Sequence, residues 1–121
     1  MSTQRKVAVI TGASQGIGAG LVRGFLDRGY RVVANSRSIQ PDPSADVLAV
    51  PGDIADAAVA DGVIGGAVER FGRVDTLVNN AGIFIAKPFT EYTEAEFAAM
   101  ISVNLAGFFH VSQRAVRQML T

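Results

Sequence analysis

A glycine-rich turn near the start of the chain has the residue types and spacing that bind a phosphate. It covers residues 11–18 and directly follows the apolar run at residues 7–10. Glycine adopts backbone conformations that other residues avoid, and it lets a ligand approach the backbone closely. A helix that begins after such a turn offers free N–H groups and the positive end of its dipole, which together attract an anion. The sequence therefore predicts a phosphate site between a strand and a helix.

The spacing of Gly12, Gly16 and Gly18 narrows the kind of phosphate site. It reads G-x-x-x-G-x-G, which differs from the G-x-G-x-x-G of the common dinucleotide fingerprint. No Lys-Ser or Lys-Thr pair follows, so the turn also matches the P-loop of nucleoside triphosphate enzymes poorly. A tight strand-to-helix turn without a ligand is the alternative. The other turns of the chain must decide between the two.

Composition limits the classes of function. The 121 residues suffice for one domain, and 11 basic residues balance 11 acidic ones, which argues against nucleic acid or an anionic membrane as the main partner. The absence of cysteine excludes disulfides, thiolate metal sites and cysteine nucleophiles, and we expect no metal site. Apolar runs are short, so we expect no membrane span, no secretory segment and a cytoplasmic protein.

Strands and helices alternate along the sequence. Apolar runs of strand length stand at residues 7–10, 31–34, 47–50 and 76–78. Helical spacing predicts helices at residues 17–28 and 56–71, and Thr93 with Glu96 forms a capping box for a last helix that ends near residue 119. Pro41 and Pro43 argue against a helix between the second and third strands. The alternation predicts an α/β fold with a doubly wound parallel sheet of the Rossmann type.

The last predicted helix carries an apolar stripe that contains one polar amide. The stripe consists of Phe97, Met100, Ile101, Asn104, Leu105, Phe108, Val111, Ala115 and Met119. A polar amide on a core-facing stripe needs hydrogen-bond partners. Asn104 is therefore either a satisfied core asparagine or part of a site. To His110 on the same helix we assign no catalytic role.

Polar or glycine-rich turns follow all the predicted strands. They stand at residues 12–18, 35–38, 52–54 and 79–82. Ligands of open α/β sheets bind outside the carboxyl ends of the strands. Turns that converge there would line a crevice with backbone N–H groups and short polar side chains. This convergence predicts a nucleotide site.

The motifs in these turns resemble the cofactor-binding half of short-chain dehydrogenases/reductases (SDRs). They are Thr11-Gly-Ala-Ser-Gln-Gly-Ile-Gly18, Gly52-Asp53-Ile54, Asn79-Asn-Ala-Gly82 and Val103-Asn104, and they span almost the whole chain. The resemblance implies an oxidoreductase that transfers hydride between a nicotinamide dinucleotide and a small-molecule carbonyl or alcohol. It also implies that residues 1–121 form the N-terminal half of a Rossmann-type dinucleotide-binding domain.

The same resemblance implies a role for individual residues. Those around the pyrophosphate and the adjacent ribose would be Gly12, Ser14, Gln15, Gly16, Ile17 and Gly18. Asp53 would accept a hydrogen bond from the adenine amino group, with the Ile54 backbone beside it. The ribose on the nicotinamide side would be lined by Asn80, Ala81 and Gly82. Asn104 would hold a water in a proton relay. The alternatives are a turn or helix-cap aspartate for Asp53 and a plain strand-end turn for the asparagine pair.

The end of the second predicted strand bears on the choice between NAD and NADP. Folds that bind NAD usually place an acid there to hold the ribose 2′-hydroxyl, whereas this chain has Ser36 and Arg37. A guanidinium suits a 2′-phosphate, so we predict NADP, with NAD as the alternative. A solvated Arg37 is the other interpretation. Gln15 weakens the prediction, because NADP-preferring relatives often carry a basic residue in that turn.

The serine and the Tyr-x-x-x-Lys pair of the family are not found. Four residues beyond Tyr30 and Tyr92 stand Ala34 and Glu96. We therefore expect the chain to be the first half of a longer enzyme and inactive alone. Relatives pair through the helix that matches residues 94–120, which predicts a homodimer or homotetramer. The alternatives are a non-catalytic nucleotide-binding or regulatory module and, less well matched at residues 79–82, a methyltransferase-like domain.

Overall fold

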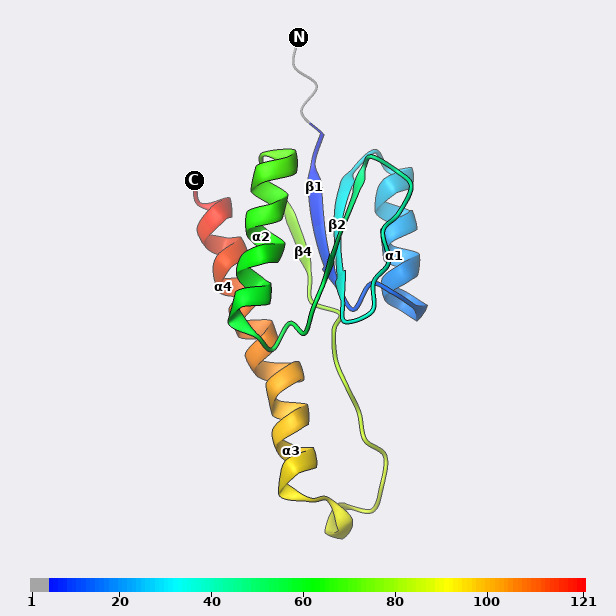
Figure 1. Ribbon diagram of the computed structural model, residues 1–121, viewed down its shortest axis with the longest axis vertical. Helices are drawn as coiled ribbons and strands as arrows, with labels where there is room; N and C mark the ends of the chain where they lie inside the picture. Colours follow the sequence, from blue (N-terminus) through cyan, green and yellow to red (C-terminus); the bar gives the residue numbers. More distant parts are fainter. Residues whose placement is uncertain (1–4) are drawn as a thin grey trace.

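The sheet has the predicted doubly wound topology. The computed structural model describes residues 5–121. In that part of the chain the strands are β1 (Val7–Thr11), β2 (Arg31–Ser36), β3 (Val47–Pro51) and β4 (Thr76–Val78). All pairs are parallel, and the strand order is β3-β2-β1-β4. The chain thus begins in the middle of the sheet and extends it first on one side and then on the other (Figure 1).

Helices cover both faces of the sheet. They are α1 (Gly16–Asp27), α2 (Ala57–Phe71), α3 (Glu94–Ile101) and α4 (Phe108–Met119), with a short η1 (Phe89–Glu91) and a π-helical η2 (Ser102–Gly107). Local signals predicted their ends well. Asp56 caps α2 by accepting a hydrogen bond from the Ala58 N–H, Gly72 ends α2 at a φ of 84°, and Thr93 and Glu96 form the capping box of α3.

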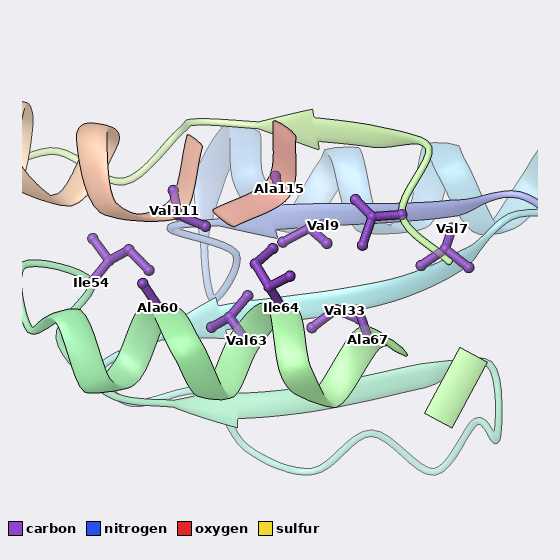
Figure 2. Packing of buried hydrophobic residues seen from close by; sticks show 11 residues of the cluster. Val7, Val9, Val33, Ile54, Ala60, Val63, Ile64, Ala67, Val111 and Ala115 are labelled. Atoms are coloured by element: carbon purple, nitrogen blue, oxygen red, sulfur yellow. The ribbon is translucent and has the colours of Figure 1, made fainter. Parts of the chain in front are cut away.

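Two cores lie on the two faces. The larger one lies between the sheet and the helices α2 and α4 (Figure 2). There Val9 and Val33 of the sheet meet Val63 of α2 and Val111 of α4, and all four side chains are fully buried. The smaller core lies between the sheet and α1 and includes Val22. No helix occurs between β2 and β3, as the prolines predicted.

The last helical stretch differs from the predicted continuous helix. A π-helical segment, η2, separates α3 from α4, and α3 extends beyond the sheet (Figure 1). Most of the predicted stripe is therefore exposed, including Phe97 at 60% and Leu105 at 59%, while Val111 and Ala115 are buried. Asn104 also lies on an exposed side, so its predicted place on a buried stripe is wrong. Periodicity marks an apolar face correctly, but it does not say whether the chain itself covers that face.

This stretch also bears on the expected absence of a membrane span. From Glu94 to Met119 the helix has 26 residues, and its most apolar window has a mean hydropathy of 1.2 and is 17% buried. By length and composition alone it qualifies as a span, which the short apolar runs of the sequence did not suggest. A core helix of a soluble protein meets the same criteria, so they do not assign this helix to a membrane.

Candidate functional site

The turn after β1 packs backbone to backbone against the turn after β4. A Cβ atom on Gly12 would lie 2.9 Å from the Ala81 backbone nitrogen, and one on Gly18 would lie 1.9 Å from the Gly12 carbonyl oxygen. Gly12 and Gly16 also have positive φ angles, of 61° and 56°. These glycines are therefore required by the packing and conformation of the chain itself, before any ligand is considered.

Hydrogen bonds fix the two turns to each other. The buried Thr11 hydroxyl oxygen accepts from the Asn80 N–H at 3.1 Å and from the Ala81 N–H at 3.0 Å. The Asn80 side chain donates from Nδ2 to the Gly12 carbonyl oxygen at 3.0 Å. This amide thus holds the turns together and does not line the hollow described below. This contact agrees with the alternative interpretation, in which the asparagine pair belongs to a plain turn at the end of a strand.

The N-terminus of α1 is open for a ligand. Its N-cap residue, Gln15, makes no side-chain capping hydrogen bond, and the first turn of α1 contains no acidic residue. Ile17 in that turn is 76% exposed. Uncapped N–H groups at the positive end of a helix favour an anion such as a phosphate.

The turn after β3 is attached to the end of β2. The buried Asn35 side chain donates from Nδ2 to the carbonyl oxygens of Val50 at 3.0 Å and Gly52 at 3.2 Å. Asp53 accepts a hydrogen bond from the Ala55 N–H at Oδ1, at 2.9 Å, so it is a turn aspartate. Asn35 thus fixes the position of the turn after β3 relative to the end of β2.

A buried hydroxyl next to this wall has no partner. The Ser36 Oγ atom is buried and has no hydrogen-bond partner among residues 5–121. Leaving a polar atom buried without a hydrogen bond costs free energy. A hydrogen bond to a ligand hydroxyl or phosphate oxygen would remove this cost. Ser36 therefore has the chemistry to bind a sugar or a phosphate.

The turns after all the strands of the described chain enclose one hollow of about 230 Å³. It is lined by Gly12, Ser14, Gln15, Asn35, Ser36, Arg37, Ser38, Gly52, Asp53, Ile54, Ala81, Gly82, Ile83 and Val103. The structure thus brings together the turns that the sequence placed at one sheet edge. Among the predicted contacts, Gly16, Ile17, Gly18 and Asn80 stand outside this lining.

Sequence reasoning missed five members of the lining as contacts. Immediate neighbours of predicted residues are Asn35, Ser38, Gly52 and Ile83, and that adjacency was the available signal. Val103 precedes Asn104 in the last motif and reaches the hollow from η2. Nothing in its own residue type distinguishes it from a core valine.

Asn104 fastens the chain after β4 to η2. Its Oδ1 accepts from the Ile83 N–H at 2.8 Å, and its Nδ2 donates to the Ile83 carbonyl oxygen at 2.9 Å. A Cβ atom on Gly82 would lie 3.0 Å from Asn104 Oδ1, so the backbone approaches this amide closely. The amide positions the segment after β4, and its role in a proton relay stays a prediction.

A second hollow, of about 390 Å³, lies behind the turn after β1. It shares Ser14, Gln15 and Ser38 with the first hollow and exists beside a β2–β3 connection that lacks a helix. Asp42 lines it, and the hydrogen bond from the Ser44 N–H, with a further one from Arg23, lowers the pKa of its carboxyl. The second hollow thus adds space next to the first, on the other side of Ser14 and Gln15.

Side chains for acid–base chemistry are scarce at this site. In the described part of the chain neither tyrosine lines the first hollow: Tyr30 packs edge-on against Phe25, and the Tyr92 hydroxyl donates to the Ile85 carbonyl oxygen. His110 also lies outside this lining. Within residues 5–121 no group of three or more His, Cys, Asp or Glu side chains is placed to hold a metal ion. Among the described residues, the lining of the first hollow contains no His, Tyr, Lys or Glu, and its charged residues are Arg37 and Asp53.

Comparison with known proteins identifies the family. The family model described as short chain dehydrogenase matches residues 6–121. This chain belongs to the short-chain dehydrogenase family. The resemblance of its motifs to SDRs is thereby confirmed, and so is the fold that the resemblance implied.

Individual SDRs agree with this assignment. L-fucose dehydrogenase of Mus musculus is 36% identical over 92% of this chain and 43% of that protein. A solved short-chain dehydrogenase/reductase from Serratia marcescens is 37% identical with a TM-score of 0.85, covering 93% of this chain and 52% of the other. The 3-ketoacyl-(acyl-carrier-protein) reductase from Brucella melitensis complexed with NADH is 32% identical, with a TM-score of 0.89, covering 97% and 51%. This SDR chain spans about half the length of the relatives it matches.

Proposed function

We propose that this chain forms the cofactor-binding half of an oxidoreductase that transfers hydride between NADP(H) and a carbonyl or alcohol. The observation that carries the proposal is the convergence of the strand-end turns around one hollow, beside the uncapped N-terminus of α1. A short-chain dehydrogenase with such a hollow at the carboxyl edge of its sheet has the expected place for a dinucleotide.

The residues present fit such a cofactor. The N-terminus of α1, where Gln15 makes no side-chain capping hydrogen bond, is suited to a pyrophosphate. The unpaired Ser36 hydroxyl is suited to a ribose or its phosphate. Asp53 lines the hollow, and its Oδ2, which accepts from Arg37 at 3.4 Å, is suited to accept from an adenine amino group. Ala81 and Gly82 offer backbone without bulk to the nicotinamide half.

When bound, the nicotinamide supplies or accepts the hydride, and the protein supplies binding and orientation. In this chain hydrogen bonds join the turns after β1 and β4, so these two parts of the site are held in a fixed relation. Proton transfer needs a further side chain. We propose that a serine and a Tyr-x-x-x-Lys pair from outside these 121 residues provide it.

The choice of NADP is proposed from charge. Arg37 lines the hollow at the end of β2, where no acidic residue stands to hold a ribose 2′-hydroxyl. In a calorimetric titration of the complete protein we expect NADP⁺ to bind about tenfold more tightly than NAD⁺, as one charge-assisted contact would give. Equal binding, or tighter binding of NAD⁺, would contradict this choice.

The activity itself is tested by turnover. The complete protein is incubated with NADPH and a panel of aldehydes, ketones, 3-oxoacyl thioesters and keto sugars, and loss of NADPH absorbance is recorded. We expect oxidation of NADPH with at least one carbonyl class. Tight NADPH binding with no turnover on any of them would favour the non-catalytic nucleotide-binding module instead.

We further propose a homo-oligomer. The α3–α4 stretch exposes large apolar side chains, among them Phe108 at 53% and Phe109 at 54%, around a shallow apolar hollow. Exposed apolar patches of this kind mark surfaces that a partner covers. Light scattering on the complete protein should give the mass of a dimer or a tetramer, whereas a monomer at all concentrations would contradict the proposal.

A further inference from the structure

Two oppositely charged side chains lie next to each other in the lining of the first hollow. Arg37 Nη2 lies 3.4 Å from Asp53 Oδ2, and the two side chains are 67% and 43% exposed. Both residues line the hollow, and they are the two charged residues among the described residues that do so. Each therefore has the other as its nearest charged neighbour in the lining.

The two ends of this pair differ in freedom. Asp53 is fixed because its Oδ1 accepts from the Ala55 N–H, and because the Asn35 side chain holds the preceding carbonyl oxygen of Gly52. Arg37 has a long side chain that is mostly exposed, and within residues 5–121 it makes no other hydrogen bond or ion pair. Of the two, Arg37 is the partner that must move when the hollow fills.

We infer that Asp53 is a specificity-determining residue for the 2′ position of the cofactor and that it acts through Arg37. The inference rests on the proposed NADP function. A 2′-phosphate would take Arg37 away from Asp53, so part of the new attraction is offset by the lost ion pair. A 2′-hydroxyl makes no such demand. The negative charge of Asp53 therefore reduces the preference for NADP below what Arg37 alone would give.

The size of the effect follows from the exposure of the pair. Ion pairs between solvent-exposed side chains are weak, so removing the charge of Asp53 should change the preference by a factor of about two to five. This is large enough to measure by calorimetry. It is also small enough that Arg37 remains the main contact to the phosphate.

The experiment uses the complete protein and two ligands that differ only at the 2′ position, adenosine 2′,5′-bisphosphate and 5′-AMP. Isothermal titration gives the ratio of their affinities for the wild type, Asp53→Asn, Arg37→Gln and the double variant. Asparagine keeps one oxygen for the Ala55 N–H and carries no charge, and any change at the adenine affects both ligands alike and cancels in the ratio. Asp61→Asn is the matched control, because it removes the same charge from a pair with Arg114 outside the hollow.

We expect Asp53→Asn to raise the preference for the bisphosphate about two- to fivefold, and Arg37→Gln to reduce it to near unity. In the double variant the preference should equal that of Arg37→Gln, and Asp61→Asn should match the wild type. An unchanged ratio in Asp53→Asn would overturn the inference. So would a rise that persists in the double variant, because Asp53 would then repel the phosphate directly.

Failure of the proposed function gives a different result. If the wild type already binds the two ligands equally well, Arg37 does not recognise a 2′-phosphate and the NADP proposal fails. If the wild type prefers the bisphosphate but Asp53→Asn leaves that preference unchanged, the role of Asp53 alone is refuted.

Discussion

The two ends of the sheet are built from different interactions. At the carboxyl end, the turns after β1 and β4 meet through glycine backbone, the Thr11 hydroxyl and the Asn80 amide. At the amino end, ion pairs connect the strands. There Arg73 lies 2.7 Å from Asp75, which also accepts from the Val7 N–H, and Arg5 lies 2.6 Å from Asp46.

This difference separates binding from stability. Neutral groups join the turns after β1 and β4, and the hollow beside them lies next to a helix N-terminus without a side-chain cap, which suits an anionic cofactor. The charges at the amino end are already paired with one another. We therefore expect substitutions at the carboxyl end to affect both cofactor binding and folding, and those at the amino end to affect folding alone.

The largest effect is expected for Gly18→Ala. A Cβ atom there would lie 1.9 Å from the Gly12 carbonyl oxygen, so the two turns must separate. In urea unfolding of the complete protein we expect a loss of about 3 kcal/mol or more, and no measurable NADP⁺ binding.

Gly20→Ala is the matched control in the same helix. A Cβ atom on Gly20 would have nothing within 4 Å, so alanine should stabilise by roughly 0.5–1 kcal/mol. Equal unfolding midpoints for the two variants would contradict the turn-on-turn packing.

Thr11→Val should have the next largest effect. Valine keeps the shape of threonine but removes the oxygen that accepts from the Asn80 and Ala81 N–H groups, so both would be left unpaired. We expect unfolding free energy to fall by about 2 kcal/mol and NADP⁺ affinity to fall with it. Thr11→Ser keeps the oxygen and should lose about 1 kcal/mol from the missing methyl group. A serine variant less stable than the valine variant would refute the role of the hydroxyl.

Asp75→Asn should have a smaller effect that depends on pH. The Arg73 side chain, aided by the Val7 N–H, holds the pKa of Asp75 below its usual value of 3.8. A lowered pKa in the folded state stabilises at neutral pH, and this stabilisation is lost as pH falls from about 4 through the folded-state value. We expect a loss of about 1 kcal/mol at pH 7 that shrinks on acidification, with NADP⁺ affinity unchanged.

The Gly20→Ala difference involves no titrating group and serves as the reference over the same pH range. If the Asp75→Asn difference stays constant down to low pH, the charge of Asp75 does not stabilise the fold. If Asp75→Asn also lowers the affinity for NADP⁺, the proposed division between binding at the carboxyl end and stability at the amino end of the sheet is wrong.

Asp46→Asn should have the smallest effect. Its carboxylate pairs with Arg5 at 2.6 Å and Arg31 at 3.8 Å, but the side chain is 39% exposed. Its pKa is lowered chiefly by the hydrogen bond from Arg5. We expect a smaller shift of the unfolding midpoint than for Asp75→Asn, which disappears in concentrated salt because exposed pairs are screened. A shift that survives salt would show that this pair is less accessible to ions than its exposure indicates.

Sequence patterns predicted what depends on neighbours along the chain. The β-branched runs at Val7 and Val32 became strands, and Thr93 with Glu96 formed the expected capping box. The turns converged because parallel strands must place their carboxyl ends at one edge. That rule needs the order of elements and no side-chain detail.

Contacts between distant segments were outside the reach of those patterns. The sequence gives no sign that the Asn80 amide bonds Gly12, or that both ends of the Asn104 amide bond Ile83. The exposure of Phe97 and Leu105 was likewise unpredictable, because helical spacing identifies an apolar face but not its cover. The exposure of these two side chains depends on how far α3 extends from the sheet, which is decided by packing.

Hydrogen–deuterium exchange of the complete protein with and without NADP⁺ tests most directly whether these turns form one dinucleotide site. We expect slower exchange on binding in peptides that cover residues 11–18, 35–38, 52–54 and 79–83, while peptides at the amino end of the sheet exchange as before. If saturating NADP⁺ protects other segments and leaves these turns unchanged, the turns do not form a dinucleotide site.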